Sequence, residues 1–348
     1  MKFLLFSVLL ILALYSASII VMIFLKCRQE RANTLLSRDV ANVCKGFAIG
    51  IIMLAHIGNT FGVRYLTPLG SWGVGIFLFL SGYGLKLSAE NKGLQGFWKK
   101  RILTAWLPYV AAEIIGILLC VTPEYSQLRL QDVVLDMLLI KTLHPFGWYM
   151  QCLFLYYIAF YLSHKLFEGN KIGSYSVLLA LSVVFFVFFR SLFKQQIFTF
   201  IFGVLTADCL NIREKIIKKP LVGSVILMLG AALLATRQLA VIRSMDWLYE
   251  LLFSAQVLCL VVGTVSFVGW LYSKAKPLLF EPALLLGVIS FEIYLYHGWI
   301  LNWIAEQTIS YPLIVVFFIG SIALSIPIYF AWHGLVAFSK KLRKFSET

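Results

Sequence analysis

Long apolar runs recur along the whole chain and constrain its fold more than any other feature. Runs of about 17 to 25 residues match the thickness of a bilayer core when they form helices. About eleven such runs are present: 3–25, 43–63, 70–87, 102–121, 146–163, 175–193, 196–211, 220–236, 248–272, 284–303 and 311–336. Backbone groups in lipid must be paired within the protein, which favours helices over other structures for such runs. The sequence therefore predicts an all-α, polytopic bundle of transmembrane helices.

The composition agrees with a protein whose main solvent is the lipid bilayer. Of 348 residues, 61% are hydrophobic and only 13% are charged, and a soluble domain cannot bury that much apolar surface. The net charge of +14 is not gathered on a soluble basic face with spaced aromatic residues, so we expect no nucleic-acid partner. Most of the 30 basic residues fall in alternate connections, which predicts an outer N-terminus and a cytoplasmic C-terminus.

The run 43–63 carries a cation near its start and an imidazole inside it. Lys45 and His56 lie on nearly one face of a helix, roughly 16 Å apart along its axis. An ionisable group within a span is costly to bury and indicates a functional site by default. The alternative is that His56 only hydrogen-bonds a neighbouring helix while Lys45 extends to the lipid headgroups. Both interpretations stay open for this helix taken alone.

Two further patterns lie toward the predicted cytoplasmic side. The sequence Ser81-Gly82-Tyr83 places two hydroxyls in one span, within a stretch of small residues whose spacing is typical of close helix packing. Lys99, Lys100 and Arg101 directly precede the next span. This cluster suits the binding of a phosphate or pyrophosphate, and it equally suits a stop-transfer signal.

Two other patterns place aromatic and ionisable side chains in later spans. Trp148 and Tyr149 open the run 146–163, where such residues anchor a helix at the headgroups or provide a surface for sugar rings. Glu292, Tyr294 and His297 lie in the run 284–303. The spacing puts Tyr294 and His297 on roughly one face and Glu292 on another.

The cysteines and histidines indicate no metal site. Six cysteines are scattered singly without a CxxC pair, and five histidines show no HxxxH or HExxH spacing. We therefore expect neither a disulfide framework nor a bound metal ion.

Taken together, these motifs resemble the acyltransferase-3 family of integral-membrane acyltransferases over roughly residues 40 to 335. The chain has lysine at position 45, where the family usually has arginine, and the run 3–25 precedes the usual ten spans. The resemblance rests on five motifs in the family's order: a basic residue and a histidine separated by ten residues (Lys45, His56), Ser-Gly-aromatic (81–83), a basic cluster before a Pro-aromatic pair (99–101, 108–109), Trp-Tyr (148–149), and Ser-x-x-Ile-Tyr-Leu-x-His (290–297).

The resemblance implies a ten-helix acyltransferase domain at 41–348, preceded at 1–40 by an extra transmembrane helix and a basic cytoplasmic linker. It implies transfer of an acyl group, with acetyl expected, from cytosolic acetyl-CoA or another acyl-CoA. The implied acceptor is a hydroxyl of an extracytoplasmic or lipid-linked glycan, as in O-acetylation of a cell-envelope polysaccharide. The expected location is the inner, or cytoplasmic, membrane of a bacterium.

The family's motifs also imply roles for individual residues. His56 is expected to act as general base on the acceptor hydroxyl, with the role of acyl carrier as the second possibility. The implied roles of the others are as follows: orientation of the donor or stabilisation of the oxyanion by Ser81, Tyr83 and Tyr294; binding of coenzyme A phosphates by Lys45, Lys99, Lys100 and Arg101; and substrate binding by Trp148, Tyr149, Glu292 and His297.

Two other classes of protein remain as alternatives. A transporter or flippase would use its buried ionisable residues to move protons or a polar solute without covalent chemistry. A binding module related to the family but without turnover would bind the donor and release no product.

Overall fold

The computed structural model describes residues 36–119, 121, 128–144, 146–188, 194–209, 212, 219–274, 277–307 and 312–346. All regular secondary structure in this part of the chain is helical, which confirms the predicted all-α class. The predicted run 3–25 lies outside the described residues. So do the other residues of the predicted segment 1–40 that precede residue 36.

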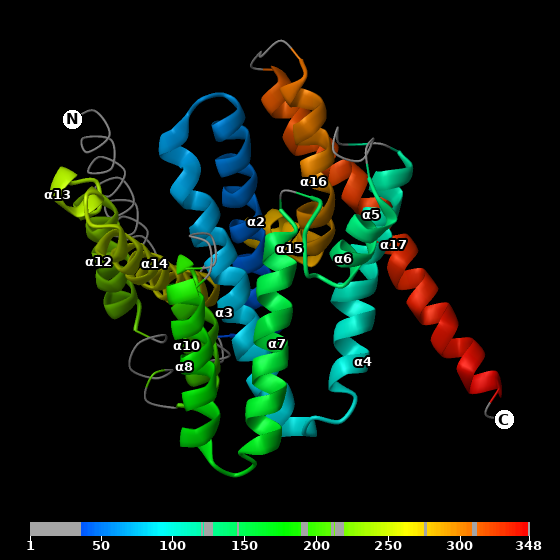
Figure 1. Ribbon diagram of the computed structural model, residues 1–348, viewed down its shortest axis with the longest axis horizontal. Coiled ribbons are helices and arrows are strands. Elements are labelled where there is room, and N and C mark those ends of the chain that lie inside the picture. Colours follow the sequence, from blue (N-terminus) through cyan, green and yellow to red (C-terminus); the bar gives the residue numbers. More distant parts are fainter. Residues whose placement is uncertain are drawn as a thin grey trace. The chain divides into compact units, whose positions relative to one another are not determined.

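The helices follow one another along the chain in the order that Figure 1 shows. Their bounds are α2 (Arg38–Thr60), η1 (Arg64–Leu66), α3 (Thr67–Lys92), α4 (Phe97–Arg101), η2 (Ile102–Trp106), α5 (Leu107–Leu118), α6 (Leu130–Met137), α7 (Trp148–Leu166), α8 (Lys171–Phe188), α10 (Ile197–Asp208), α12 (Pro220–Thr236), α13 (Ala240–Arg243), α14 (Asp246–Lys274), η5 (Pro277–Phe280), α15 (Glu281–Val288), α16 (Ser290–Ala305) and α17 (Pro312–Ser346). Each run predicted after residue 40 overlaps at least one of these helices.

Six helical segments in the described residues are long and apolar enough to cross a membrane, and α15 with α16 would make a seventh span. The six are Arg38–Thr60, Arg64–Lys92, Phe97–Leu118, Lys171–Phe188, Asp246–Lys274 and Pro312–Ala337. Helices α10 and α12 are apolar but shorter. The predicted count of eleven is therefore not confirmed, whereas the polytopic helical character is.

The run 284–303 does not form the single helix that its hydropathy predicts. The chain bends sharply at Ile289, between α15 and α16. Gly287, at the end of α15, lies against the backbone of α2, where an added Cβ would be 1.8 Å from the carbonyl oxygen of Asn42. This close contact fixes the end of α15 on α2, and α16 begins as a new helix.

The chain divides into two compact units. Unit 1 consists of Met1–Ala55, Arg64–Gln95 and Cys152–Gly287. Unit 2 consists of His56–Val63, Gly96–Gln151 and Val288–Thr348.

Unit 1 is held together by apolar packing and by glycines that let helices approach closely. Its core includes Ile76 and Phe79 of α3 and Val257 and Val261 of α14. Gly82 lies against the backbone of α10, as the spacing of small residues predicts for a packing position. Not every glycine of the stretch serves this purpose, because a Cβ added at Gly50 or Gly84 would meet no atom within 4 Å.

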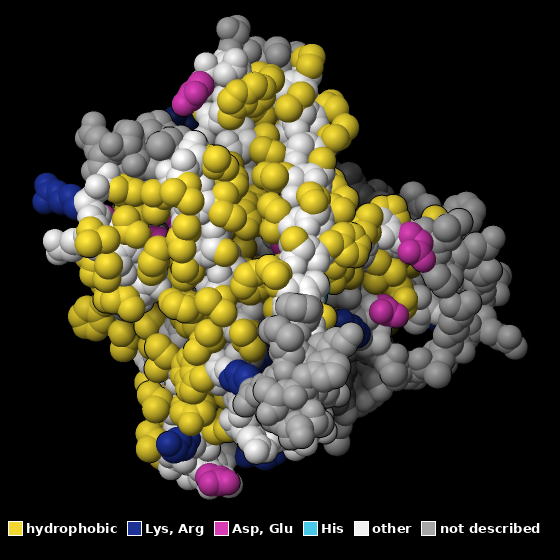
Figure 2. Space-filling view, turned by 90° about the vertical axis from the view of Figure 1, so that its right-hand side faces the viewer, with side chains coloured by type: hydrophobic (Ala, Val, Ile, Leu, Met, Phe, Trp, Pro, Cys, Tyr) yellow, Lys and Arg dark blue, Asp and Glu magenta, His cyan; other side chains and the backbone are white. Residues whose placement is uncertain are grey.

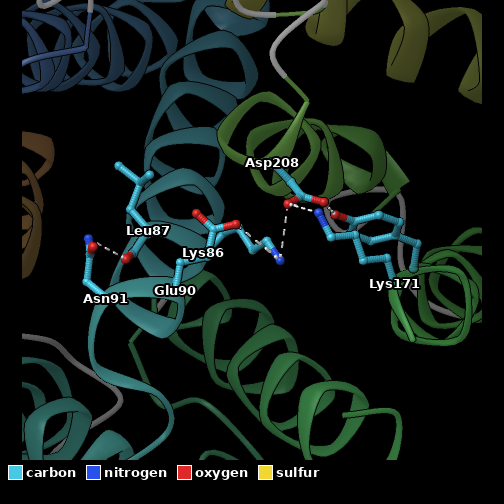
Figure 3. Close-up of polar contacts among 7 residues, drawn as sticks. Lys86, Leu87, Glu90, Asn91, Lys171 and Asp208 are labelled. Carbon is cyan, nitrogen blue, oxygen red and sulfur yellow. Dashed lines mark hydrogen bonds and ion pairs between the residues drawn. The ribbon is translucent and has the colours of Figure 1, made fainter. Parts of the chain in front are cut away.

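A buried charge in unit 1 is compensated by an ion-pair network (Figure 3). Lys86 of α3 lies 3.6 Å from a carboxylate oxygen of Asp208, at the end of α10. Asp208 also accepts hydrogen bonds from Lys171, at 2.7 Å, and from the hydroxyl of Tyr175, both on α8. Because an uncompensated buried ammonium is costly, this network explains how α3 carries a lysine that is almost fully buried.

The surface has the character expected of a protein in lipid. On the face seen in Figure 2, hydrophobic side chains predominate and most charged side chains lie near the margins. Large apolar side chains are exposed on the helices themselves, among them Leu118 of α5, Val187 and Phe188 of α8, and Ile319 and Phe330 of α17. In a soluble protein such patches mark interaction sites, whereas in a membrane protein they meet acyl chains.

Candidate functional site

Several of the predicted site residues meet in unit 2, around the ring of Phe146. His56, in the last turns of α2, packs on this ring with the two centroids 4.1 Å apart. His297 of α16 stacks on Phe146 at 4.9 Å and meets His56 edge to face at 5.1 Å. His297 is fully buried, and His56 is partly exposed. The accessible member of this histidine pair is therefore His56.

Two tyrosines close one side of the cluster. Tyr294, one turn before His297 on α16, donates a hydrogen bond to the backbone carbonyl of Phe146. Tyr149, at the start of α7, packs edge to face on Tyr294 with the centroids 5.0 Å apart. Tyr294 thus ties the short connection before α7 to α16, and Phe146 is held where both histidines contact it.

A third histidine belongs to the cluster, although no sequence pattern assigned it to a site. His144 lies in the connection before α7, with its ring 5.2 Å from that of Phe146. Burial, together with the neighbouring His297, lowers the pKa of His144 to about 3, so this imidazole is neutral at any physiological pH. In the sequence, only its position four residues before the Trp-Tyr motif could have drawn attention to it.

Hydrogen bonds from α5 and α6 fix the connection that carries His144 and Phe146. The buried carboxylate of Asp136 on α6 accepts from the hydroxyl of Tyr109, at 2.7 Å, and from the backbone N–H of Leu143, at 2.9 Å. The indole of Trp106 donates to the carbonyl of Met137 at 2.8 Å. Tyr109 belongs to the Pro-aromatic motif, which therefore acts here by supporting the loop.

The three side chains of the predicted basic cluster on α4 differ in their exposure. Lys99 and Lys100 are exposed. Arg101 is buried, with its guanidinium 4.8 Å from the centre of the Phe97 ring. A cation over an aromatic face is stabilised by the ring's quadrupole. The three side chains therefore differ in their access to a ligand.

The remaining predicted residues lie elsewhere. Lys45, Ser81 and Tyr83 belong to unit 1, where the hydroxyls of Ser81 and Tyr157 are 3.3 Å apart. Trp148 is partly exposed beside Tyr149. Glu292 is buried on α16 and interacts electrostatically with His333 of α17.

The polar groups of the cluster are not arranged as metal ligands. Among the described residues, no three His, Cys, Asp or Glu side chains form a group that could hold a metal ion. The histidines around Phe146 instead present single ring nitrogens within an aromatic surrounding, which suits hydrogen bonding and proton transfer.

The fold and the cluster define a polytopic helical membrane protein with an imidazole site at the end of one helix. The model of a protein family described as an acyltransferase domain matches residues 40–332. The chain therefore belongs to the acyltransferase-3 family, as its motifs predict, and it has the acyltransferase domain of that family. No curated protein and no solved structure gives a significant match to it.

Replacing Gly298 with alanine is expected to disturb the cluster without touching a proposed substrate contact. An added Cβ would lie 2.5 Å from Nε2 of His144 and 2.9 Å from the ring of Phe146, so both side chains must move. Overpacking of this kind costs about 1 to 3 kcal/mol. Thermal unfolding in detergent measures the effect. Gly334→Ala is the control because a Cβ there meets no atom within 4 Å, and equal stability of the two variants would contradict the packing described.

Proposed function

We propose that this protein transfers an acyl group, acetyl being the expected one, from cytosolic acetyl-CoA or another acyl-CoA to a hydroxyl of a glycan. The acceptor is an extracytoplasmic or lipid-linked saccharide, and the enzyme is an O-acyltransferase of a bacterial inner membrane. The observation that carries the proposal concerns the exposure and the hydrogen bonding of the His56 imidazole. In a chain of an acyltransferase family, its imidazole is partly exposed, and its ring nitrogens make no hydrogen bond within the described part of the chain.

The chemistry requires a base at the acceptor hydroxyl. In the proposed reaction, His56 takes the hydroxyl proton as the oxygen attacks the thioester carbonyl, and it later returns a proton to the departing coenzyme A thiolate. A base must be neutral before it acts, and the apolar surroundings of Phe146 favour the neutral form of an imidazole. We propose that Ser81, Tyr83 and Tyr294 orient the donor or stabilise the oxyanion.

The donor is proposed to bind through cations. Lys45, Lys99, Lys100 and Arg101 would pair with the phosphates of coenzyme A. The exposure of Lys99 and Lys100 supports this role. A lysine at position 45 would supply a point charge, whereas an arginine would supply a bidentate contact.

The acceptor is proposed to meet the aromatic side chains at the start of α7. Trp148 is partly exposed, and its indole offers a flat surface on which a sugar ring stacks. Tyr149 borders the cluster that contains His297, and the carboxylate of Glu292 is a potential hydrogen-bond acceptor for sugar hydroxyls.

We also propose the orientation predicted from the basic residues, with an outer N-terminus and a cytoplasmic C-terminus.

Binding of acetyl-CoA to the purified protein tests the donor. Removing one charged phosphate contact costs about 1.5 kcal/mol or more, so Lys45→Ala and Lys99→Ala are each expected to weaken binding at least about tenfold in calorimetric titrations. Lys92→Ala, which removes another exposed lysine, is the matched control and should bind like the wild type.

Addition of glycan acceptors to the loaded protein then tests the transfer. Release of free coenzyme A thiol is expected only when a suitable acceptor is present. Binding without thiol release for any acceptor would indicate a binding module. The absence of binding for every coenzyme A ester would instead favour a transporter or flippase.

A further inference from the structure

Two buried ring nitrogens in the histidine cluster have no hydrogen-bond partner among the described residues. They are Nε2 of His144 and Nε2 of His297, in side chains that are 4% and 0% exposed, respectively. A buried polar atom without a partner costs free energy, so each such atom needs an explanation. The two atoms are not equivalent, because the opposite nitrogen of each ring is bonded differently.

The bonds at Nδ1 determine which of these atoms carries a proton. Nδ1 of His297 lies 3.0 Å from the carbonyl oxygen of Ile293 and 2.8 Å from that of Tyr294. A carbonyl oxygen only accepts, so Nδ1 of His297 carries the proton and Nε2 bears a lone pair. In His144 the reverse holds, because Nδ1 accepts from the backbone N–H of Phe146 at 3.3 Å. The neutral ring of His144 therefore has its proton on Nε2.

Among the described residues whose rings contact His297, His56 is the one that is both partly exposed and able to donate a proton to this lone pair. The ring of His297 is flanked by Phe146, at 4.9 Å, by Tyr294, at 6.1 Å, and by Phe317, at 6.3 Å. The two phenylalanines donate no proton, and the hydroxyl of Tyr294 donates to the carbonyl of Phe146. His144, whose Nε2 carries a proton, is buried. His56 lies 5.1 Å from the ring of His297, edge to face, and is the partly exposed histidine of the cluster. A fully buried His297 does not meet a glycan directly, so any influence it has on transfer passes through His56.

We propose that His297 is a positioning residue for His56: the two rings are in contact without a hydrogen bond, and a turn of the His56 ring during transfer lets its N–H donate to the Nε2 lone pair of His297. This inference rests on the proposed function. The bond selects the tautomer of His56 in which the other ring nitrogen bears a lone pair facing the acceptor hydroxyl. It also stabilises the imidazolium that forms during transfer, as an oriented acceptor does behind the histidine of a catalytic triad.

Every proton in the proposed step is accounted for. The proton of the acceptor O–H moves to the lone pair of His56 while the new C–O bond forms and the C–S bond of the thioester breaks. His56 keeps its other proton in the bond to His297. The transferred proton then passes to the coenzyme A thiolate, and His297 retains its own proton on Nδ1 throughout.

Two substitutions separate this role from a merely structural one. His297→Asn places an amide near the position of Nδ1 and keeps a donor for the helix carbonyls, but it loses the acceptor at Nε2. His297→Gln places an amide oxygen near Nε2 and keeps an acceptor for His56. We expect kcat to fall about 100-fold in the asparagine variant and only about tenfold in the glutamine variant. The KM for the acceptor should remain unchanged in both.

His164→Gln is the matched control. His164, in unit 1, also bonds through Nδ1 to a helix carbonyl, that of Phe160 at 2.9 Å, and its Nε2 has no partner in the described residues. This variant should keep wild-type kinetics. Higher activity in the asparagine than in the glutamine variant would overturn the proposal, because backbone anchoring would then be what matters. A raised KM with unchanged kcat would overturn it too, because that result indicates direct contact with the acceptor.

Nitrogen-15 NMR of histidine-labelled protein tests the contact without any activity. In the wild type, His297 should show the Nδ1–H tautomer, and on addition of acetyl-CoA His56 should shift to a single tautomer with a hydrogen-bonded N–H. In the asparagine variant under the same conditions, His56 should remain a mixture of tautomers. A His56 spectrum that is the same in the wild type and the asparagine variant overturns the proposal. A failure of the wild type to transfer any acyl group refutes the proposed function instead, and leaves the spectra to decide the histidine contact.

Discussion

Replacing His56 with glutamine is expected to lower the rate of acyl transfer at least about 1,000-fold and to leave acetyl-CoA binding intact. A positioned general base contributes about 100- to 10,000-fold to such reactions, and glutamine cannot accept the acceptor's proton. The fold should survive, because the imidazole is partly exposed and its nitrogens bond to no described residue. Thiol release from acetyl-CoA in the presence of acceptor measures the rate.

Incubation of the wild type with acetyl-CoA alone distinguishes the two possible roles of His56. A general base leaves no acylated protein, whereas an acyl carrier accumulates acetyl-histidine when acetyl-CoA is supplied without an acceptor. Mass spectrometry of the wild type under those conditions should therefore show no added acetyl group. Full activity of His56→Gln, with His164→Gln as the reference for a neutral histidine substitution, would exclude both roles.

The hydropathy of the sequence predicted the helices because lipid leaves the backbone few alternatives. It found the segments that became α2, α3 and α14, each with a long apolar stretch. It did not predict the break at Ile289, which follows the close contact of Gly287 with the backbone of Asn42. A contact between segments far apart in sequence leaves no trace in a local average of hydropathy.

The candidate site was predicted in part. The sequence did not predict the side chains that connect its members. His56, Tyr149, Tyr294 and His297 were each selected from the sequence, and the structure brings them together. Phe146, the ring on which the histidines pack, was not selected. It lies in a loop whose position is set by the buried carboxylate of an acidic residue on α6. Such tertiary support cannot be read from residue spacing.

Charge along the sequence was also a poor guide to exposure. Lys99, Lys100 and Arg101 form one basic cluster in the sequence, yet only the two lysines of this cluster are exposed. Consecutive residues of a helix point in directions about 100° apart, so a run of cations cannot share one face. The face of Arg101 is the one that packs on Phe97, and an alanine there is expected to lose packing as well as charge. The lysines are therefore the cleaner positions at which to test donor binding.

Replacing Gly82 with alanine is expected to destabilise unit 1 by about 3 kcal/mol or more, a large effect for one methyl group. The new Cβ would lie 2.2 Å from the carbonyl oxygen of Phe200 and 3.1 Å from its carbon. These atoms belong to the backbone of α10 and cannot rotate away, so α3 and α10 must separate. Unfolding in detergent, followed by heat or by denaturant, measures the loss.

Gly84→Ala on the same helix is the control, because a Cβ there meets no atom within 4 Å and should change stability little. The contact is reciprocal, since a Cβ at Gly203 of α10 would lie 2.1 Å from the carbonyl oxygen of Phe79 on α3. Once one substitution has separated the helices, the other finds more room. The double variant Gly82→Ala/Gly203→Ala should therefore be clearly more stable than the sum of the two single losses predicts. Strictly additive losses would mean that the two glycines act at independent contacts, contrary to the close packing of α3 on α10.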